Sequence, residues 1–187
     1  MKIKLFILLV AISFSAVTFA QEENTMYVII NGVKWAPCNV ATSGTFVKKP
    51  EDAGRFYQWN CKTGFSNCGT SWKSDTWEKA NDPSPSGWRL PTLEEFKTLL
   101  DTDKVSNEWT TENGMNGRKF TDKTTGSSIF LPATGYIFDG VVCDNGSVCL
   151  YWISKPDYFV YFSFGNDRNR LNHDLRRAAS KLRLVAE

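Results

Sequence analysis

Hydrophobic and polar residues alternate with a period of two through much of the second half of this chain. Between Tyr158 and Phe164 the even positions hold Tyr, Val, Phe and Phe, and the odd positions hold Phe, Tyr and Ser. Because successive side chains of a strand point to opposite faces, this pattern predicts a half-buried strand with one apolar face. Apolar runs bounded by turn residues predict further strands at 26–30, 33–36, 118–121, 128–131, 136–138, 141–143, 150–153 and 182–185.

One segment has a helical period instead. Thr92 and Glu95 have the spacing of a capping box, in which each side chain bonds the backbone N–H of the other residue. Apolar residues at 93, 96, 99 and 100 then form one stripe, which predicts a helix that ends at position 101. Capping accounts for Glu95 and solvation for Glu94, so the two are not interpreted as a catalytic carboxylate pair.

Irregular segments separate these elements. Residues 60–75 are rich in Gly, Ser, Thr, Asn and Lys, and a loop of this length usually has a staple or a function. The segment 81–87 contains two prolines, which exclude regular structure there. A helix-bearing half followed by many short strands predicts the α+β class, with mostly antiparallel strands, few helices and long loops.

The first twenty residues have the order of an export signal. Lys2 and Lys4 lie in a short basic segment, an apolar run extends from Leu5 to Val17, and small residues precede a polar break after Ala20. The apolar run is shorter than the ~20 residues that a membrane-spanning helix needs. We therefore expect a signal peptide at 1–20, a single domain at 21–187, no transmembrane segment, and a secreted, periplasmic or cell-surface location.

Composition narrows the classes of partner. The chain has 22 basic and 20 acidic residues, and removal of Lys2 and Lys4 with the signal leaves equal numbers of each. A neutral domain does not favour nucleic acid or an anionic membrane as a partner. Aromatic residues are abundant, with 7 Trp, 6 Tyr and 13 Phe, and some of them are candidates for stacking on a ligand.

The five cysteines are disulfide candidates in an oxidising compartment. Pairing of near neighbours predicts the bridges Cys61–Cys68 and Cys143–Cys149, and leaves Cys38 without a partner. The second bridge requires an odd-length turn around Asn145-Gly146, because a two-residue turn would place Cys143 opposite Val148.

Several short motifs resemble one family along nearly the whole mature chain. The chain is similar to the Fibrobacter succinogenes major paralogous domain (FISUMP) in the segments 30–36 (Ile-Asn-Gly-Val-Lys-Trp-Ala), 50–54 (Pro-Glu-Asp-Ala-Gly), 56–59 (Phe-Tyr-Gln-Trp), 77–83 (Trp-Glu-Lys-Ala-Asn-Asp-Pro), 87–92 (Gly-Trp-Arg-Leu-Pro-Thr), 120–123 (Phe-Thr-Asp-Lys), 131–136 (Leu-Pro-Ala-Thr-Gly-Tyr), 151–154 (Tyr-Trp-Ile-Ser) and 182–185 (Leu-Arg-Leu-Val). The resemblance implies a C-type-lectin-like fold of the formylglycine-generating-enzyme branch, in exported proteins of Bacteroidetes and related bacteria. Lectin-like folds of this kind bind sugars or proteins, and the role of the family itself is largely undefined.

The chain departs from the family pattern in two places. Many members read Asp-Pro-Cys-Pro where this chain has Ser84 in the third position, so a partner of Cys38 in such members would be lost here. The closing strand is preceded by Ala-Ser-Lys at 179–181 in place of the usual Gly-Phe approach, while its Arg-Leu-Val core is kept.

Motifs for catalysis and metal binding are missing from the sequence. It contains no nucleophile elbow, phosphate-binding loop, dinucleotide fingerprint or zinc-protease motif, and its one histidine is His173. An odd cysteine such as Cys38 and a lone histidine such as His173 can be explained without catalysis, so we do not interpret them as a catalytic dyad. No cysteine follows Cys149, so the resemblance does not imply the formylglycine-generating activity. The usual lectin calcium signatures are absent too. We therefore expect no enzyme activity, cofactor or metal site. The sequence leaves open a calcium site formed by backbone carbonyls.

The segment 165–177 is the candidate ligand surface. It is rich in Asn and Arg, whose amide and guanidinium groups give directional hydrogen bonds to hydroxyls and carboxylates, and it lies between two predicted strands. In lectin-like folds such late loops often form the ligand surface, and a plain solvated loop is the alternative. The predicted ligand-binding residues are Trp152, Tyr161, Asn166, Arg168, Asn169, Arg170, Asn172 and His173.

Two functions are compatible with these features. The first is an exported, non-catalytic recognition module that binds a glycan or protein at the bacterial surface. The second is a structural or adhesive subunit of a surface assembly, without a small-ligand site. An enzyme that uses a site not evident from the sequence is a remote third option.

Overall fold

The computed structural model describes residues 26–65, 74, 76–154, 160–165, 169–173 and 178–187, and its description of Cys149, 160–163 and 169–173 covers the backbone alone. The helical elements of this part of the chain are the short helix α1 (Leu93–Thr98) and the 3-10 turn η2 (Lys79–Asn81). The strands are β1 (Val28–Ile30), β2 (Val33–Trp35), β3 (Tyr57–Gln58), β4 (Trp88–Arg89), β5 (Val105–Glu112), β6 (Met115–Asp122), β7 (Ser128–Pro132), β8 (Tyr136–Phe138), β9 (Val141–Cys143), β10 (Val148–Ile153), β11 (Val160–Gly165), β12 (Asn169–His173), β13 (Ala179–Ser180) and β14 (Val185–Ala186).

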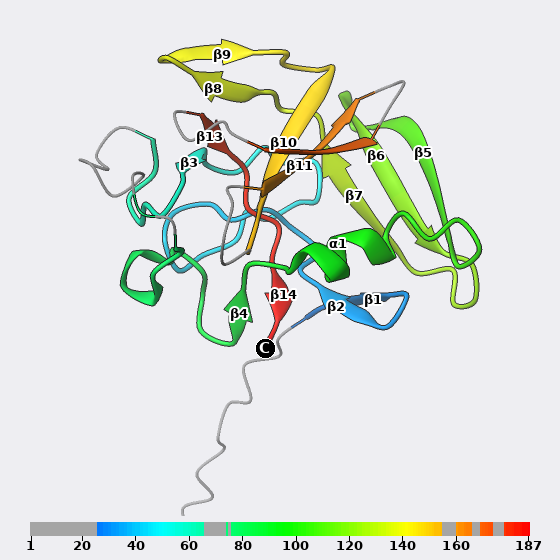
Figure 1. Cartoon of the computed structure of the whole chain (residues 1–187). Helices are drawn as coiled ribbons and strands as arrows, with labels where there is room; N and C mark the ends of the chain where they lie inside the picture. Colours follow the sequence, from blue (N-terminus) through cyan, green and yellow to red (C-terminus); the bar gives the residue numbers. More distant parts are fainter. Residues whose placement is uncertain (1–25, 66–73, 75, 155–159, 166–168, 174–177) are drawn as a thin grey trace, which may run out of the picture.

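The strands form four small antiparallel sheets, and Figure 1 shows them arranged around a common centre. Their strand orders are β1-β2-β14-β4, β10-β11-β12, β3-β13-β8-β9 and β5-β6-β7. The predicted predominance of short antiparallel strands with few helices is thereby confirmed for the described residues, and it agrees with a small mostly-β or α+β fold.

Two-residue turns set the register of three hairpins. The pairs Asn31-Gly32, Asn113-Gly114 and Asp139-Gly140 all have positive φ at both positions, as a type I′ turn requires. They join β1 to β2, β5 to β6 and β8 to β9, with the flanking residues paired directly across each turn. The hairpins predicted at 31–32 and 139–140 are confirmed, and the one at 113–114 adds a strand, β5, that the apolar pattern did not indicate.

The segment that follows β13 connects the sheets. Figure 1 shows it running through the centre of the molecule to β14, which lies between β2 and β4. On the way its backbone bonds β10 through Lys181, and the loop after β2 through Leu182 and Leu184. Because this segment pairs with strands from both ends of the chain, it closes the fold.

Arg183 fixes this closing segment from inside the core. Its side chain is fully buried, and its guanidinium donates to Asn39 Oδ1 at 3.0 Å, to the Ala36 carbonyl at 3.0 Å, to the Phe130 carbonyl at 2.9 Å and to the Pro37 carbonyl. The planar guanidinium presents several donors in a fixed geometry, so one side chain satisfies acceptors from two separate segments, residues 36–39 and β7.

The helix forms where its sequence predicts it. Thr92 Oγ1 accepts the backbone N–H of Glu95 at 3.2 Å, and the Glu95 carboxylate accepts the backbone N–H of Thr92 at 2.7 Å, which confirms the capping box. The helix buries Phe96, whose ring meets Trp35 edge to face with centroids 5.1 Å apart. Its last helical residue is Thr98, and Leu99 is the C-cap, so it ends earlier than predicted.

The segment 165–177 differs from the predicted loop. Residues 169–173 form β12, which pairs with β11 along its whole length. The strand was not predicted because the residues of this stretch are polar. Its pairing depends on the apolar β11 beside it and not on its own composition. Across the described residues, none of the helices is long and apolar enough to cross a membrane.

Candidate functional site

Those predicted ligand-binding residues that the structure describes lie on the β10-β11-β12 sheet, and one of them is a core residue. Trp152 is fully buried, its indole N–H donates to the Tyr57 carbonyl at 2.8 Å, and its ring meets Trp59 with centroids 5.4 Å apart. A ring enclosed in this way has no face for a ligand. The prediction that Trp152 contacts ligand is therefore corrected, because β10 is covered on both faces: Tyr151 and Trp152 point to opposite faces and both are fully buried.

The register of β11 and β12 divides the other predicted residues between two faces. Arg170 pairs with Ser163 and Asn172 pairs with Tyr161, whereas Asn169 pairs with Phe164 and His173 pairs with Val160. Since alternate residues share a face, Tyr161, Arg170 and Asn172 lie on one face of the sheet, and Asn169 and His173 lie on the other. Asn166 and Arg168 lie outside the described residues.

Two hollows that the sequence did not indicate flank the segment 82–88. The first, here called the polar cleft, has a volume of about 440 Å³ and is lined by Lys62, Trp77, Lys79, Asp82, Ser84, Pro85, Ser86, Gly87, Trp88, Arg89 and Glu187. The second, here called the apolar groove, has a volume of about 670 Å³ and is lined by Met26, Pro37, Cys38, Gly44, Phe46, Val47, Lys48, Pro85, Ser86 and Trp88. Both volumes fall in the range of small-ligand sites, about 300–1,000 Å³.

Local hydrogen bonds and one bond to a neighbouring loop fix the backbone of the segment between the two hollows. Asp82 Oδ1 accepts the backbone N–H of Ser84 at 2.8 Å, a local turn that aspartate readily forms. The Pro83 carbonyl accepts the Gly44 N–H at 2.8 Å, and the Pro85 carbonyl accepts the Trp88 N–H at 3.1 Å. Prolines fix φ and thereby reduce the freedom of the backbone, so this wall of the polar cleft is preorganised.

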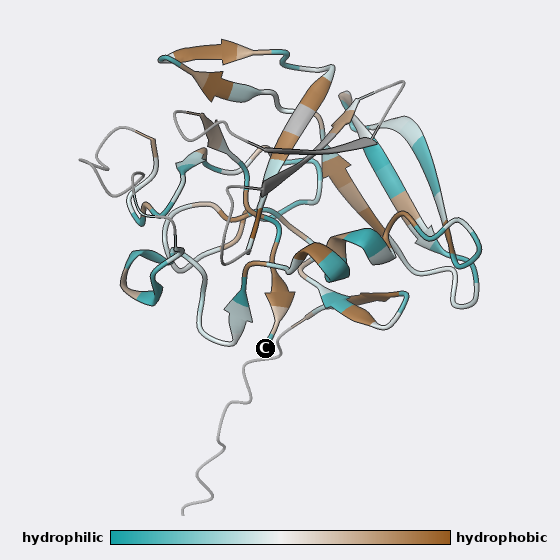
Figure 2. Ribbon diagram, viewed as in Figure 1, coloured by the Kyte–Doolittle hydropathy of each residue, from teal (hydrophilic) through white to brown (hydrophobic). Residues whose placement is uncertain are grey.

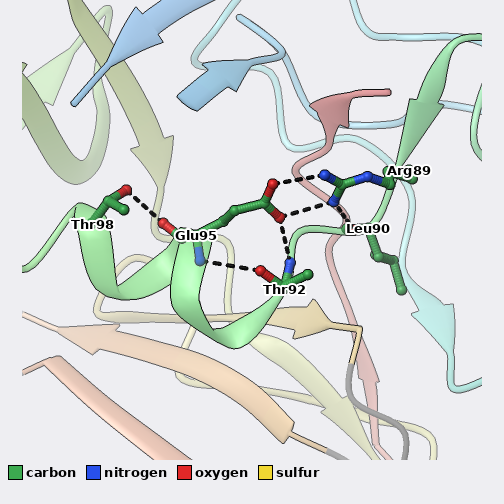
Figure 3. A network of polar contacts seen from close by, with 5 residues as sticks. All are labelled: Arg89, Leu90, Thr92, Glu95 and Thr98. Atoms are coloured by element: carbon green, nitrogen blue, oxygen red, sulfur yellow. Dashed lines mark hydrogen bonds and ion pairs between the residues drawn. The ribbon is translucent and has the colours of Figure 1, made fainter. Parts of the chain in front are cut away.

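Arg89 forms another wall of the polar cleft and is anchored to α1. Figure 3 shows its guanidinium facing the Glu95 carboxylate, with the two Nη–Oε distances at 2.7 and 2.8 Å, and a further bond at 3.1 Å to the Leu90 carbonyl. The hydrogen bonds from Arg89 are the main reason why the pKa of Glu95 lies below its usual value, and the same pairing raises the pKa of Arg89. Glu95 thus caps the helix and orients Arg89, which confirms its structural interpretation.

Trp77 supplies the aromatic surface of the polar cleft. Its half-buried ring meets the buried Trp59 edge to face with centroids 5.1 Å apart. Among the described residues, neither the buried Trp77 Nε1 nor Ser84 Oγ in the same cleft has a hydrogen-bond partner. Trp77 begins one of the family-like motifs and Ser84 is a departure from the family pattern, and the sequence does not indicate that the two residues line one cleft.

The cysteines agree only partly with the predicted bridges. Cys61 is disulfide-bonded, and its predicted partner Cys68 lies outside the described residues. Cys143 is a free thiol, so the predicted bridge from Cys143 to Cys149 is wrong. The physical reason is the turn at 144–147, which does not join two paired strands: Cys143 pairs with Tyr136 in one sheet, and β10 pairs with β11 in another.

The remaining thiol, Cys38, borders the apolar groove. It is free and buried, and burial is the main cause that raises its pKa above the usual value of a thiol. A raised pKa keeps the sulfur protonated, and the thiolate is the nucleophilic form. Cys38 therefore has the character of a packed hydrophobe, which disfavours the Cys38/His173 dyad as a catalytic pair.

Neither metal-binding side chains nor comparisons with known proteins identify a function. The described part of the chain holds no group of three or more His, Cys, Asp or Glu residues that could bind a metal ion. Comparisons of the chain with models of protein families, with curated proteins and with solved structures gave no match. The polar cleft is thus the candidate site that the geometry itself provides.

Proposed function

We propose that this protein is an exported, non-catalytic recognition module with a C-type-lectin-like fold of the FISUMP type, which binds a glycan or protein ligand at the bacterial surface. The single observation that carries the proposal is the polar cleft, where a preorganised backbone presents an aromatic ring and buried polar atoms that have no partner in the part of the chain that the structure describes. Such a cleft is suited to binding, because ligand groups complete hydrogen bonds that the fold does not make.

The non-catalytic part of the proposal is supported by the chemistry of the reactive groups. The one histidine lies on β12, and the buried Cys38 has a raised pKa. The family resemblance and the signal-like residues 1–20 support export.

A binding assay with paired variants tests this proposal. The exported protein is applied to a glycan array and used for capture from extracts of the surrounding microbial community or host. We expect selective binding that Trp77→Ala weakens and that Thr111→Ala, an exposed position near the end of β5, leaves unchanged. Loss of binding in Arg170→Ala but not in Trp77→Ala would move the site to the β12 face, and failure of both assays would overturn the recognition function.

A second candidate function has a specific observation in its favour. The β8-β9 hairpin lies at the edge of its sheet, and Val141 and Val142 on β9 are 63% and 52% exposed. Figure 2 shows this hairpin as an apolar ribbon at the margin of the molecule. An apolar edge strand can pair with another chain, as a structural or adhesive subunit would require.

The oligomeric state distinguishes this second candidate. A structural subunit is expected to associate with increasing concentration in light scattering after size-exclusion chromatography, and Val142→Lys is expected to abolish that association. A monomer at all concentrations, with no change in Val142→Lys, would count against the structural role and leave recognition as the proposed function.

A further inference from the structure

Two buried polar atoms of the polar cleft need partners that the described residues do not supply. Trp77 Nε1 can only donate a hydrogen bond, and Ser84 Oγ can donate and accept. An unsatisfied buried donor costs roughly 1–3 kcal/mol, so the cleft favours a ligand that brings an acceptor oxygen to the indole N–H. Both atoms are covered in the structure, so a ligand that bonds them requires rotation of the half-buried Trp77 ring and of the Ser84 side chain.

The charges around these atoms exclude a strongly ionic ligand. Lys62 and Lys79 line the cleft together with Asp82 and Glu187, so the positive and negative side chains balance. The guanidinium of Arg89 adds no net attraction for an anion, because the Glu95 carboxylate binds it in a bidentate pair. A polyanion would meet two carboxylates here, and a polycation would meet two lysines.

The balanced set matches the chemistry of hydroxyl groups. A hydroxyl donates one hydrogen bond and accepts others, so neighbouring hydroxyls can face ammonium donors and carboxylate acceptors in turn. The Trp77 ring adds an apolar surface for the C–H face of a sugar ring. A peptide also offers carbonyl acceptors, but it lacks the dense alternation of donors and acceptors that this cleft presents.

We propose that the polar cleft binds a neutral saccharide, one oxygen of which accepts a hydrogen bond from Trp77 Nε1. This inference rests on the proposed recognition function and names the class of ligand and the contact that selects it. Ser84 Oγ bonds a second oxygen of the same sugar, and the lysines and carboxylates of the rim bond its outer hydroxyls.

The indole N–H resonances of the ¹⁵N-labelled protein test the contact directly. The probes are glucose, galactose, mannose and N-acetylglucosamine, with glucuronic and galacturonic acids and a pooled tetrapeptide library for comparison. The Trp77 resonance is assigned by its disappearance in Trp77→Phe, which keeps a ring against Trp59. We expect at least one neutral sugar to shift the Trp77 resonance downfield in a saturable way.

Trp35 provides an internal control for this experiment. Its indole Nε1 is also buried without a partner among the residues described, but its ring packs on Phe96 in the core and lines neither hollow. Its resonance is therefore expected to stay unchanged as the sugar is added. A shift of both resonances by equal amounts would show a general solvent effect and overturn the proposed contact.

Matched variants then measure the contribution of the contact. Trp77→Phe is expected to weaken binding of the active sugar about tenfold and Ser84→Ala about threefold to tenfold, as the loss of one hydrogen bond predicts. Ser106→Ala, on the exposed side of β5, should leave the dissociation constant unchanged. If Trp77→Phe does not fold, as judged by the other indole resonances, Ser84→Ala carries the comparison.

Several results would overturn this inference without touching the recognition function. They are tighter binding of a uronic acid than of its neutral sugar, a Trp77 shift caused by peptides and by no sugar, or array binding that persists fully in both Trp77→Phe and Ser84→Ala. Failure of the array and the capture assay together would instead overturn the recognition function itself.

Discussion

Replacement of Arg183 by methionine should remove a large part of the stability of this fold. Methionine fills much of the volume of the arginine stem but donates no hydrogen bond. The substitution therefore leaves four acceptors without this donor: the buried Asn39 Oδ1, the buried carbonyls of Ala36 and Phe130, and the partly buried carbonyl of Pro37. Three of them lie within residues 36–39 and the fourth on β7, so the Arg183 side chain links these two parts of the chain.

The magnitude follows from the number of lost bonds. An unsatisfied buried group costs roughly 1–3 kcal/mol, and carbonyls, which have a second lone pair, fall at the lower end. Four such groups give a loss of about 4 kcal/mol, against a total stability of about 5–15 kcal/mol for a domain. Lysine in place of Arg183 keeps the charge but offers three donors at one point, so its loss should be about half as large.

Urea unfolding followed by tryptophan fluorescence measures these losses, with disulfides intact. At an m-value of about 2 kcal/mol/M, Arg183→Met should lower the midpoint by about 2 M and Arg183→Lys by about 1 M. The matched control is Lys97→Met, which removes an exposed cation paired with Glu94 and should change stability by less than about 0.5 kcal/mol. A loss below about 1 kcal/mol in Arg183→Met, with an unchanged m-value, would refute this reasoning.

Three further predictions concern a glycine, a carboxylate and the thiols. Gly135→Ala should lower stability by about 3 kcal/mol in calorimetry, because Gly135 has φ +68° and an added Cβ would overlap the Cys143 carbonyl. Glu95→Gln should lower the free energy of unfolding by about 1 kcal/mol at pH 7, and this difference should shrink as pH falls from about 5 through the lowered native pKa of Glu95, where the carboxylate of the native state is protonated. Iodoacetamide followed by peptide mapping should label Cys143 in the native protein, and Cys38 only after unfolding.

Each of these predictions has a matched control. Gly140→Ala, at φ +83° with nothing within 4 Å of the added Cβ, should cost only about 1–2 kcal/mol, and an equal loss at both glycines would contradict the overlap. Glu94→Gln, on the exposed side of the same helix, should change stability by less than about 0.5 kcal/mol. A pH-independent effect of Glu95→Gln would rule out the proposed linkage, and equally fast labelling of Cys38 and Cys143 would rule out the burial argument.

Local rules were sufficient for the turns and the helix. A pair such as Asn31-Gly32 adopts positive φ at low cost, so a hairpin there needs no information from the rest of the fold. The capping box of Thr92 and Glu95 likewise depends on residues three apart. The same reasoning did not reveal that Glu95 also binds Arg89, although only six positions separate them, because their contact depends on the path of the chain before the helix.

The candidate site depended on contacts that the sequence does not contain. The polar cleft brings together Lys62, Trp77, Arg89 and Glu187, which lie far apart along the chain. The Asn- and Arg-rich composition after residue 165 predicted a ligand-binding loop. Part of this stretch is instead the strand β12, which pairs with the apolar β11. Trp152 was misjudged for a related reason: an aromatic residue has the same pattern on a strand whether its face is covered or open.

Backbone amide mapping of the ¹⁵N-labelled protein with a ligand selected on the glycan array tests the central claim most directly. If the polar cleft is the recognition site, the largest shift changes lie at the amides of 62, 77–79, 82, 84 and 86–89, while the amides of β9 and β12 stay close to their free positions. Changes concentrated on β12 or on the β8-β9 hairpin, with the cleft amides unmoved, would contradict the account.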